Sequence, residues 1–481
     1  MSFIKNIDQE VYRNYFLKLL ATVFIVLLAQ SAVAQYIHAI HDYKPAPGQF
    51  INTAGGILES AEGIIGSEGG LVSLGAYGGY IVFSFEQSVE NHSDNPYGVD
   101  FVIFGNATAE FSEAGIVSVM KDENANNLPD DTWYELAGSD YFFTSSHKSY
   151  SINYTDPHSD IASDIFWEDN SSETGFVYAN SFHLQSYYPN QNFDPSFYSE
   201  NCTFNGTEIN AVTDFSDAFR VKSYPRKFGY ADNNFSTGIE TDLPDNPYSP
   251  ENEGMGGDAM DISWAIDSYG NYVELDQIHF VKIYTALNGN VGSLGELSTE
   301  IRSAVDISPS SNTHGSDSML VIEDFPSTII SGEYPLKAHF YKSGRKVTNQ
   351  NILWSVIKGD ASINTKGVLF ANQVGELDIL AKTGDLEAII HTVVGNDLSA
   401  NLMDNFAASV KVYPNPFINE IYISGKGMMD FELMGIDGKM YFETKNSNGD
   451  FLVYTNELPS GIYFLKLSNE KGFKVYKLIK I

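Results

Sequence analysis

The sequence is poor in cysteine and in basic residues, and both shortages restrict what the protein can be. Cys202 is the only cysteine among 481 residues, so no disulfide can form within the chain. Lys and Arg number 28 against 62 Asp and Glu, which gives a formal net charge of −34. This excess of negative charge argues against nucleic acid as a partner and favours cations or neutral ligands.

The short motifs that mark the commonest catalytic sites are also missing. The sequence contains no Gly-x-Ser-x-Gly, no His-Glu-x-x-His and no Gly-x-x-x-x-Gly-Lys-Ser/Thr. A glycosidase needs only two carboxylates at a suitable separation, which cannot be recognised among so many acidic residues. A polysaccharide hydrolase therefore stays open as an alternative, although no catalytic residue is predicted.

Long apolar runs are confined to the beginning of the sequence. Residues 1–34 combine Lys and Arg, an apolar run near Leu19–Leu28 and the small residues Ala32-Val33-Ala34. This order predicts a secretory signal peptide, with Gln35 as the first residue of the mature protein. No later segment approaches the about 20 apolar residues that a membrane-spanning helix needs, so we predict no transmembrane segment in the mature chain.

Short runs with β-strand character dominate residues 35–305, where helical periodicity is almost absent. The runs are bounded by Gly, Asn, Asp or Pro, and the clearest cover residues 80–85, 100–104, 115–120 and 278–284. They predict a large antiparallel β-sandwich. Between about Thr144 and Pro250 the sequence is rich in Asn, Ser and Asp, and it predicts long loops of the kind that often carry function.

The rest of the chain divides by composition into two further β-domains. We predict a linker at 306–317, a β-domain at 318–395, a second linker at 396–410 and a small C-terminal β-sandwich at 411–481. The last of these holds 9 Lys against 8 acidic residues. The segment before it therefore carries all of the acidity, which marks residues 411–481 as a different kind of module.

The C-terminal segment opens with Tyr413-Pro-Asn-Pro, contains the strand Gly461-x-Tyr463-x-x-x-Leu467 and ends in a basic strand. With these motifs it closely resembles the sorting domain of type IX secretion substrates in Bacteroidetes. The resemblance implies the type IX secretion machinery as a partner. It also implies export to the outer cell surface or the medium, with this segment as the address.

Two weaker resemblances concern the preceding domains. The stretches around Asp100–Asn106, Glu113–Tyr141 and Gly256–Thr285 resemble Bacteroidetes cell-surface proteins related to galactose-binding-like jelly rolls. Residues 318–395, with Trp354 on a strand, resemble bacterial Ig-like domains. The expected fold is therefore all-β and multi-domain, with a jelly-roll-like domain, an Ig-like sandwich and a small C-terminal sandwich.

A calcium site is predicted in the stretch KDENANNLPDD. Oxygen-bearing residues at alternate positions follow the early ligand order of calcium loops, in which a backbone carbonyl takes the seventh place. The predicted ligands are Asp122, Asn124, Asn126, Leu128 (through its carbonyl), Asp130 and Asp131. Asn127 stands where such loops usually have Gly, and Trp133 stands where they have the closing Glu, so Asp131 or Glu135 would have to close the site. The alternative is an ordinary solvated turn.

A ligand site is predicted from aromatic and acidic residues in the first domain. Aromatic rings beside Gly or polar loop residues could stack on sugar rings, whereas most other aromatic residues are needed for the core. Asp258 and Asp261 could meet a ligand at a strand start, if Ile262, Trp264 and Ile266 alternate on one face, or Asp258 could simply cap a turn. The predicted ligand-binding residues are Tyr77, Tyr80, Trp133, Tyr230, Asp258 and Asp261.

These patterns together predict a secreted or surface-attached binding protein. It would be stabilised by calcium and would bind a glycan or another small nutrient through its first domain. The alternatives are a surface polysaccharide hydrolase and a purely structural adhesin.

Overall fold

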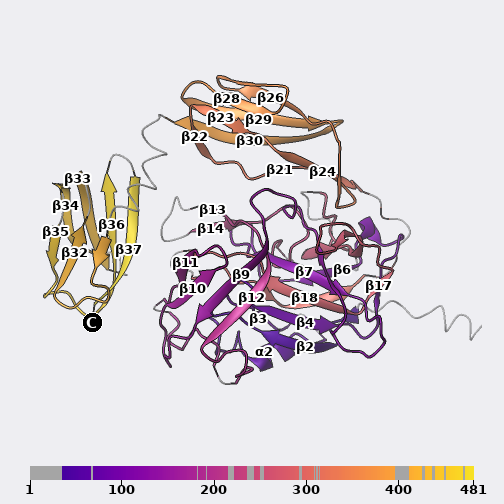
Figure 1. Ribbon diagram of the computed structural model, residues 1–481, viewed down its shortest axis with the longest axis horizontal. Helices are drawn as coiled ribbons and strands as arrows, with labels where there is room; N and C mark the ends of the chain where they lie inside the picture. Colours follow the sequence, from indigo (N-terminus) through magenta and orange to yellow (C-terminus); the bar gives the residue numbers. More distant parts are fainter. Residues whose placement is uncertain are drawn as a thin grey trace, which may run out of the picture. The chain divides into compact units, whose positions relative to one another are not determined.

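The computed structural model divides the chain into two compact units (Figure 1). Unit 1 comprises residues 1–318 with 342–345, and unit 2 comprises residues 319–341 with 346–481. The structure describes residues 35–66, 69–180, 182–190, 192–214, 221–235, 243–249, 254–291, 295–307, 309, 313, 315–395, 411–424, 428–435, 439–448, 451–469 and 472–480. The predicted signal peptide and the predicted linker at 396–410 lie outside these residues.

The centre of unit 1 is an antiparallel sheet of six strands. In spatial order its strands are β16 (Ala265–Ile266), β8 (Trp133–Leu136), β7 (Gly115–Met120), β18 (Phe280–Thr285), β4 (Tyr80–Ser84) and β2 (Ala39–Lys44). All six residues of β7 are buried, as expected for a strand covered on both faces. Three of the predicted strands, at 80–85, 115–120 and 278–284, belong to this sheet.

A second sheet joins the beginning and the end of unit 1. Its order is β1 (Gln35–Tyr36), β20 (Ser303–Asp306), β6 (Phe101–Phe104) and β15 (Asp258–Met260). Strand β6 is buried along its whole length, and around it the apolar cluster contains Val99, Met255 and Val305. The predicted strand at 100–104 therefore forms the middle of this sheet.

A third sheet lies in the region that the sequence predicted to be long loops. Its order is β11 (Thr174–Val177), β10 (Ile165–Asp169), β9 (His147–Thr155) and β12 (Asn201–Glu208), and Figure 1 shows these strands side by side within unit 1. The loop prediction for 144–250 is therefore wrong for these strands. Their exposed face consists mainly of Asn, Thr and Ser, so the composition resembled that of a loop although inward residues alternate with outward ones.

Smaller elements complete unit 1. They are the paired strands β13 (Val212–Asp214) with β14 (Lys222–Tyr224), β17 (Gln277–Ile278) with β5 (Val89–Glu90), and β19 (Glu300–Ile301) with β3 (Val72–Ser73), together with the helix α2 (Leu58–Glu62) and the 3-10 turns η1 (Pro96–Gly98) and η2 (Ile262–Trp264). The expectation of very little helix is confirmed for the described residues. None of their helices is long and apolar enough to cross a membrane.

Unit 2 contains two groups of sheets, each with its own apolar core. The first consists of β21 (Ser318–Ile322), β24 (Ala338–Lys342) and β25 (Arg345–Val347); β22 (Thr328–Ile330), β30 (Leu386–Gly395), β29 (Gly375–Thr383) and β26 (Leu353–Lys358); and β23 (Gly332–Pro335), β28 (Val368–Ala371) and β27 (Ala361–Ile363). Leu369, Leu377 and Ile379 are fully buried between them, and Trp354 packs against this core.

The second group of sheets lies at the C-terminus. It consists of β31 (Lys411–Tyr413), β32 (Glu420–Ser424) and β35 (Phe451–Tyr454), and of β34 (Met440–Asn448), β33 (Met428–Gly435), β36 (Gly461–Asn469) and β37 (Gly472–Lys480). Phe417, Phe431, Leu465 and Leu467 are buried in its core. Residues 411–481 therefore form a β-sandwich with a core of its own, as predicted.

Candidate functional site

The predicted calcium ligands lie in a connection between two neighbouring strands. Strand β7 ends at Met120 and β8 begins at Trp133, and these two residues face each other in the antiparallel ladder. The sheet thus fixes both ends of the segment from Asp122 to Asp131, here called the Asp122 loop. A loop fixed in this way loses little conformational entropy when it binds an ion.

Asp122 organises the loop from within. Its side chain is buried, and its two carboxylate oxygens accept hydrogen bonds from the backbone N–H groups of Asn126 (3.2 Å) and Asn127 (2.8 Å). Asn127 has a φ of 58°, which is the left-handed conformation that calcium loops normally assign to Gly. Asn tolerates this conformation better than most residues, so the departure from Gly does not prevent the turn.

The remaining predicted ligands face one another across the loop. Nδ2 of Asn126 donates to both oxygens of Asp130 at 3.1 and 3.2 Å, and Nδ2 of Asn124 lies 3.4 Å from carboxylate oxygens of both Asp130 and Asp131. The Leu128 carbonyl accepts from the Asp130 N–H at 2.9 Å, while the Leu128 side chain is exposed. The amide NH₂ groups thus stand where a cation would neutralise the carboxylates.

Asp131, and not Glu135, is placed to close the loop. Asp131 Oδ2 accepts from the backbone N–H of Glu123 at 2.9 Å, which brings this carboxylate back to the start of the loop. Glu135 instead accepts from Tyr284 Oη at 2.6 Å and Thr207 Oγ1 at 2.8 Å. The donor set of the loop consists of carboxylate, amide and carbonyl oxygens, which fits a hard cation such as Ca²⁺.

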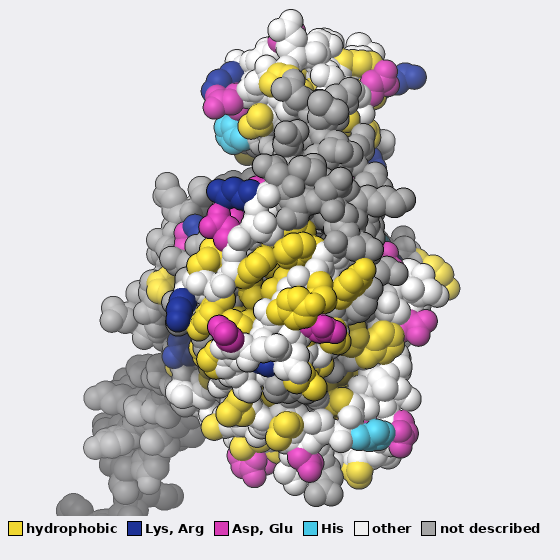
Figure 2. All heavy atoms as spheres, turned by 90° about the vertical axis from the view of Figure 1, so that its left-hand side faces the viewer, with side chains coloured by type: hydrophobic (Ala, Val, Ile, Leu, Met, Phe, Trp, Pro, Cys, Tyr) yellow, Lys and Arg dark blue, Asp and Glu magenta, His cyan; other side chains and the backbone are white. Residues whose placement is uncertain are grey.

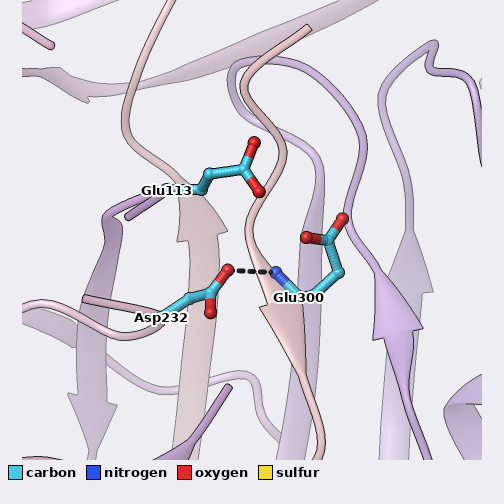
Figure 3. Close-up of side chains that lie close together, drawn as sticks. All are labelled: Glu113, Asp232 and Glu300. Carbon is cyan, nitrogen blue, oxygen red and sulfur yellow. Dashed lines mark hydrogen bonds between the residues drawn. The ribbon is translucent and has the colours of Figure 1, made fainter. Parts of the chain in front are cut away.

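A second group of acidic side chains in unit 1, two of them buried and one half-buried, was not predicted. Glu113 precedes β7, Asp232 lies in the segment Gly229–Asn233, and Glu300 begins β19, yet their carboxylate oxygens lie within 4.8 Å of one another. Figure 3 shows the three carboxyl groups gathered around a common point. We call these three residues the carboxylate cluster.

Two members of the carboxylate cluster hold the backbone of irregular segments, while the third, Glu300, accepts from the Ser298 hydroxyl at 2.8 Å. Asp232 accepts from the N–H groups of Asn106, Ala107 and Glu300, each at 2.9 Å, and Glu113 accepts from the Ser298 N–H at 3.0 Å. A side chain at Gly105 would collide with Asp232, so this residue must be Gly. The carboxylates therefore substitute for the regular hydrogen bonds that these segments lack.

Burial and mutual repulsion change the acidity of the carboxylate cluster. Burial raises the pKa of Glu113 and of Asp232 well above the ordinary range, and the charge of Glu300 adds to both shifts. Glu113 and Glu300 are also hydrogen-bonded to each other, which requires a shared proton. Three carboxylates this close cannot all be ionised unless a cation neutralises them.

The sequence does contain a signal for the carboxylate cluster. Glu113 precedes the apolar run of β7, and Glu300 stands directly before Ile301 in a short buried strand. A charged residue within or beside a buried strand needs a partner. The identity of the partners could not be inferred, because the three residues lie more than 60 positions apart.

The six predicted ligand-binding residues do not form one exposed site. Tyr77 and Tyr230 belong to the core, with relative exposures of 0% and 2%, and the Tyr230 hydroxyl accepts from the Asp140 N–H at 3.1 Å. The prediction that these two residues stack on a sugar ring was wrong, because the glycines beside them let other side chains pack closely and do not expose the rings to solvent. Tyr80 is half-buried, donates to Asp42 at 2.7 Å and has the Lys282 ammonium 4.1 Å from its ring centre. Trp133 is half-buried on β8.

Asp258 and Asp261 are also structural in their contacts. Asp258 is buried and accepts from the N–H groups of Asn233 (3.0 Å) and Asn234 (2.9 Å), and burial raises its pKa to about 7. Asp261 caps the turn η2 by accepting from the Ser263 N–H at 2.7 Å. The predicted alternation from Ile262 to Ile266 on one strand was wrong, because η2 occupies its first half.

One comparison with known proteins identifies the C-terminal sandwich. Residues 411–481 match the family described as the Secretion system C-terminal sorting domain. The chain is therefore a cargo of the type IX secretion system, exported to the cell surface or beyond, which confirms this part of the sequence prediction. No match was found among curated proteins.

Solved structures give only distant likenesses. The chain is similar to PorZ, a surface component of the type IX secretion system of Porphyromonas gingivalis, at 18% identity and a TM-score of 0.15, over 30% of this chain and 20% of PorZ. It is similar to the S-layer protein SbsC at 10% identity and a TM-score of 0.17, over 80% of this chain and 55% of the other. A tandem of titin Ig domains gives 11% identity and a TM-score of 0.13, over 32% and 89%. Likenesses this low carry no argument about function.

Proposed function

We propose that this exported chain is a calcium-stabilised binding protein of the cell surface, and that unit 1 binds a glycan or another small nutrient. The observation that carries the calcium assignment is the arrangement of the Asp122 loop, in which Asn127 supplies the left-handed turn and Asp131 returns to the loop start. Calcium loops of extracellular proteins bind with dissociation constants of about 10⁻⁴–10⁻³ M. This range suits an ion that serves stability outside the cell.

The charge distribution supports a neutral ligand rather than an acidic one. Acidic side chains are scattered over the face of the molecule drawn in Figure 2, with fewer basic side chains among them. Together with the net charge of −34, this would repel nucleic acids and acidic polysaccharides. A hydrolase and a purely structural adhesin are the competing functions, and an assay for cleavage of polysaccharides separates the first of these from a binding protein.

The calcium assignment is tested by thermal unfolding of the mature protein in chelator and in 10 mM calcium. Binding to the native state with the affinity above should stabilise it by about 1.4–2.7 kcal/mol and raise the melting temperature of unit 1. Asp130→Asn should remove most of this rise, because it takes a negative charge and one oxygen away from the predicted calcium ligands. The fold of the loop should tolerate the change, because an amide has nearly the shape of the carboxylate, which is hydrogen-bonded to the side-chain amides of Asn124 and Asn126.

Asp267→Asn is the matched control for that experiment. Asp267 lies in a hairpin loop and accepts from the N–H groups of Tyr269 and Asn271 at 2.9 Å. It therefore shares the local geometry of a loop aspartate, and it is not one of the predicted calcium ligands. A melting temperature that does not respond to calcium, or an equal response in wild type and Asp130→Asn, would contradict the assignment.

The export route is tested by removing the C-terminal sandwich. A chain that ends before Lys411 should still fold, because residues 411–481 have a separate apolar core to which the other described residues do not contribute. This truncated chain should remain in the periplasm. Surface labelling of whole cells and fractionation measure the result. Truncated protein that still reaches the cell surface would show that another segment carries the address.

A further inference from the structure

The outward face of the sheet β11-β10-β9-β12 combines aromatic rings with a ladder of amides and hydroxyls. On β12 the exposed residues Asn201, Thr203 and Asn205 alternate with the buried residues Cys202 and Phe204. The same alternation continues on the neighbouring strands. The members of this face, here called the amide face, are Ser151, Asn153 and Thr155 of β9, Phe166 and Glu168 of β10, Thr174 and Phe176 of β11, and Asn201, Thr203 and Asn205 of β12.

The strand register places these side chains in rows across the sheet. One row contains Thr174, Glu168, Asn153 and Thr203, which face one another in successive ladders. In the neighbouring row Phe176 faces Phe166, and Thr155 faces Asn201. The kind of side chain thus changes across the sheet. The aromatic residues lie on β11 and β10, and the amides and most of the hydroxyls lie on β9 and β12.

The aromatic side of the face is a cluster of neighbouring rings that meet at interplanar angles of 69° and 38°. The rings of Phe166 and Phe176 lie 5.6 Å apart between centroids, and Tyr178, just beyond β11, lies 5.9 Å from Phe176. Their relative exposures are 37%, 42% and 47%. Single exposed aromatic residues are common, but three adjacent rings on one sheet usually mark a contact surface. Their electron-rich faces attract the weakly positive C–H groups of a sugar ring.

The polar side of the face is held in a fixed arrangement. Thr203 Oγ1 donates to Asn153 Oδ1 at 2.9 Å, while Asn153 Nδ2 and Thr155 Oγ1 both lie 3.4 Å from Asn201 Oδ1. Amides and hydroxyls both donate and accept hydrogen bonds, as the hydroxyl groups of a sugar do. Because these groups stand on strands and fix one another, little entropy is lost when a ligand binds.

The charge of the face selects the kind of ligand. Glu168 is the one ionisable residue in the two rows, although the chain as a whole carries a net charge of −34. A protein partner with a basic surface would be attracted to other parts of the chain, and an acidic polymer would find no cation on this face. A neutral, polyhydroxylated chain matches both the rings and the amides.

We propose that the amide face is a binding site for a neutral polysaccharide, which lies across the four strands with its sugar rings on Phe166, Phe176 and Tyr178. Four strands spaced by about 4.8 Å span roughly 14 Å, so the face contacts a short run of sugar units within a longer chain. The site rests on the proposed function, since it gives the glycan-binding alternative a place and a substrate class.

Affinity electrophoresis tests the site with the mature protein in gels that contain soluble neutral glucans, xylans, mannans or galactans. Wild type should be retarded by at least one class, and calorimetry with that polysaccharide should give a dissociation constant. The double variant Phe166→Ala/Phe176→Ala should weaken binding at least about tenfold, which corresponds to the loss of two stacking contacts. The control is Tyr269→Ala, because Tyr269 is 89% exposed in a hairpin loop outside the amide face.

A second double variant guards against loss of the fold. Asn201→Ala/Thr203→Ala changes only exposed side chains and should weaken binding about threefold or more, with an unchanged melting temperature. Binding that both double variants leave intact would overturn the site while the proposed glycan-binding function stands. Retardation by none of the polysaccharides would overturn the site and leave only the small-nutrient alternative. A dimer that Phe166→Ala/Phe176→Ala dissociates would assign the face to self-association instead and overturn the proposal.

Discussion

The Asp122 loop and the carboxylate cluster are both built from acidic side chains, but these side chains differ in exposure and in the groups that they bind. In the loop, most of the acidic and amide side chains are exposed and face one another across a turn. In the cluster, Asp232 and Glu300 are buried and Glu113 is half-buried. Glu113 and Asp232 accept from backbone N–H groups, and Glu300 accepts from the Ser298 hydroxyl. An acidic group thus favours a cation where its oxygens remain accessible, and it acts as a substitute for regular backbone pairing where they do not.

The largest effect should come from the carboxylate cluster. Asp232→Ala leaves the N–H groups of Asn106, Ala107 and Glu300 without their acceptor, and each such loss costs about 1–3 kcal/mol where the group is buried. The free energy of unfolding of unit 1, measured in urea, should fall by at least about 3 kcal/mol. Asp232→Asn retains one acceptor oxygen and should cost less. Equal and small losses in both variants would show that these segments do not depend on Asp232.

A pH dependence of intermediate size should distinguish the buried acids from the exposed ones. Burial raises the pKa of Glu296 to about 7 from the ordinary 4.5. The native state therefore keeps a proton that the unfolded state releases, and stability present at pH 4 is lost as the pH rises through 7. The loss for this group is at most about 3 kcal/mol.

Glu296→Gln isolates that contribution. Its amide oxygen can still accept the bond from the Gln49 N–H, which is 2.7 Å long in the native protein, so the variant should unfold with a flatter dependence on pH between 5 and 8. Glu59→Gln on the surface helix α2 serves as the control and should follow wild type. A free energy of unfolding that rises with pH equally in all three proteins would contradict the raised pKa.

The smallest effect should come from the left-handed turn of the Asp122 loop. Asn127→Gly should leave stability nearly unchanged, since Gly adopts a φ near 58° without strain. Asn127→Val should cost about 1–2 kcal/mol and should weaken the response of the melting temperature to calcium. Stability and calcium response that are the same in both variants would mean that the turn is not needed for the ion.

The sequence predicted best where apolar residues alone decide the structure. Strand β7 has the predicted bounds because Gly115–Met120 is an apolar run buried on both faces. The calcium site in the Asp122 loop comes from a local pattern and stays a prediction. The return of Asp131 to the Glu123 N–H depends on how the chain folds back and had to be observed.

The prediction failed where contacts between residues distant in the sequence decide the structure. Asn201, Thr203 and Asn205 looked like loop residues, although the buried Cys202 and Phe204 between them give the period of two that marks a strand. Tyr77 and Tyr230 looked accessible because glycines flank them, whereas those glycines admit other side chains instead. A residue's neighbours in space cannot be read from its neighbours in sequence.

The ladder between β1 and β20 has a consequence for how unit 1 reaches its native state. Gln35 pairs with Asp306 and Tyr36 with Val305, so the second sheet closes only after nearly the whole of unit 1 has been synthesised. Contacts between residues so distant in sequence give a high contact order, and folding rates fall steeply as contact order rises. Unit 1 should therefore fold slowly, and only once its last strands are available to pair.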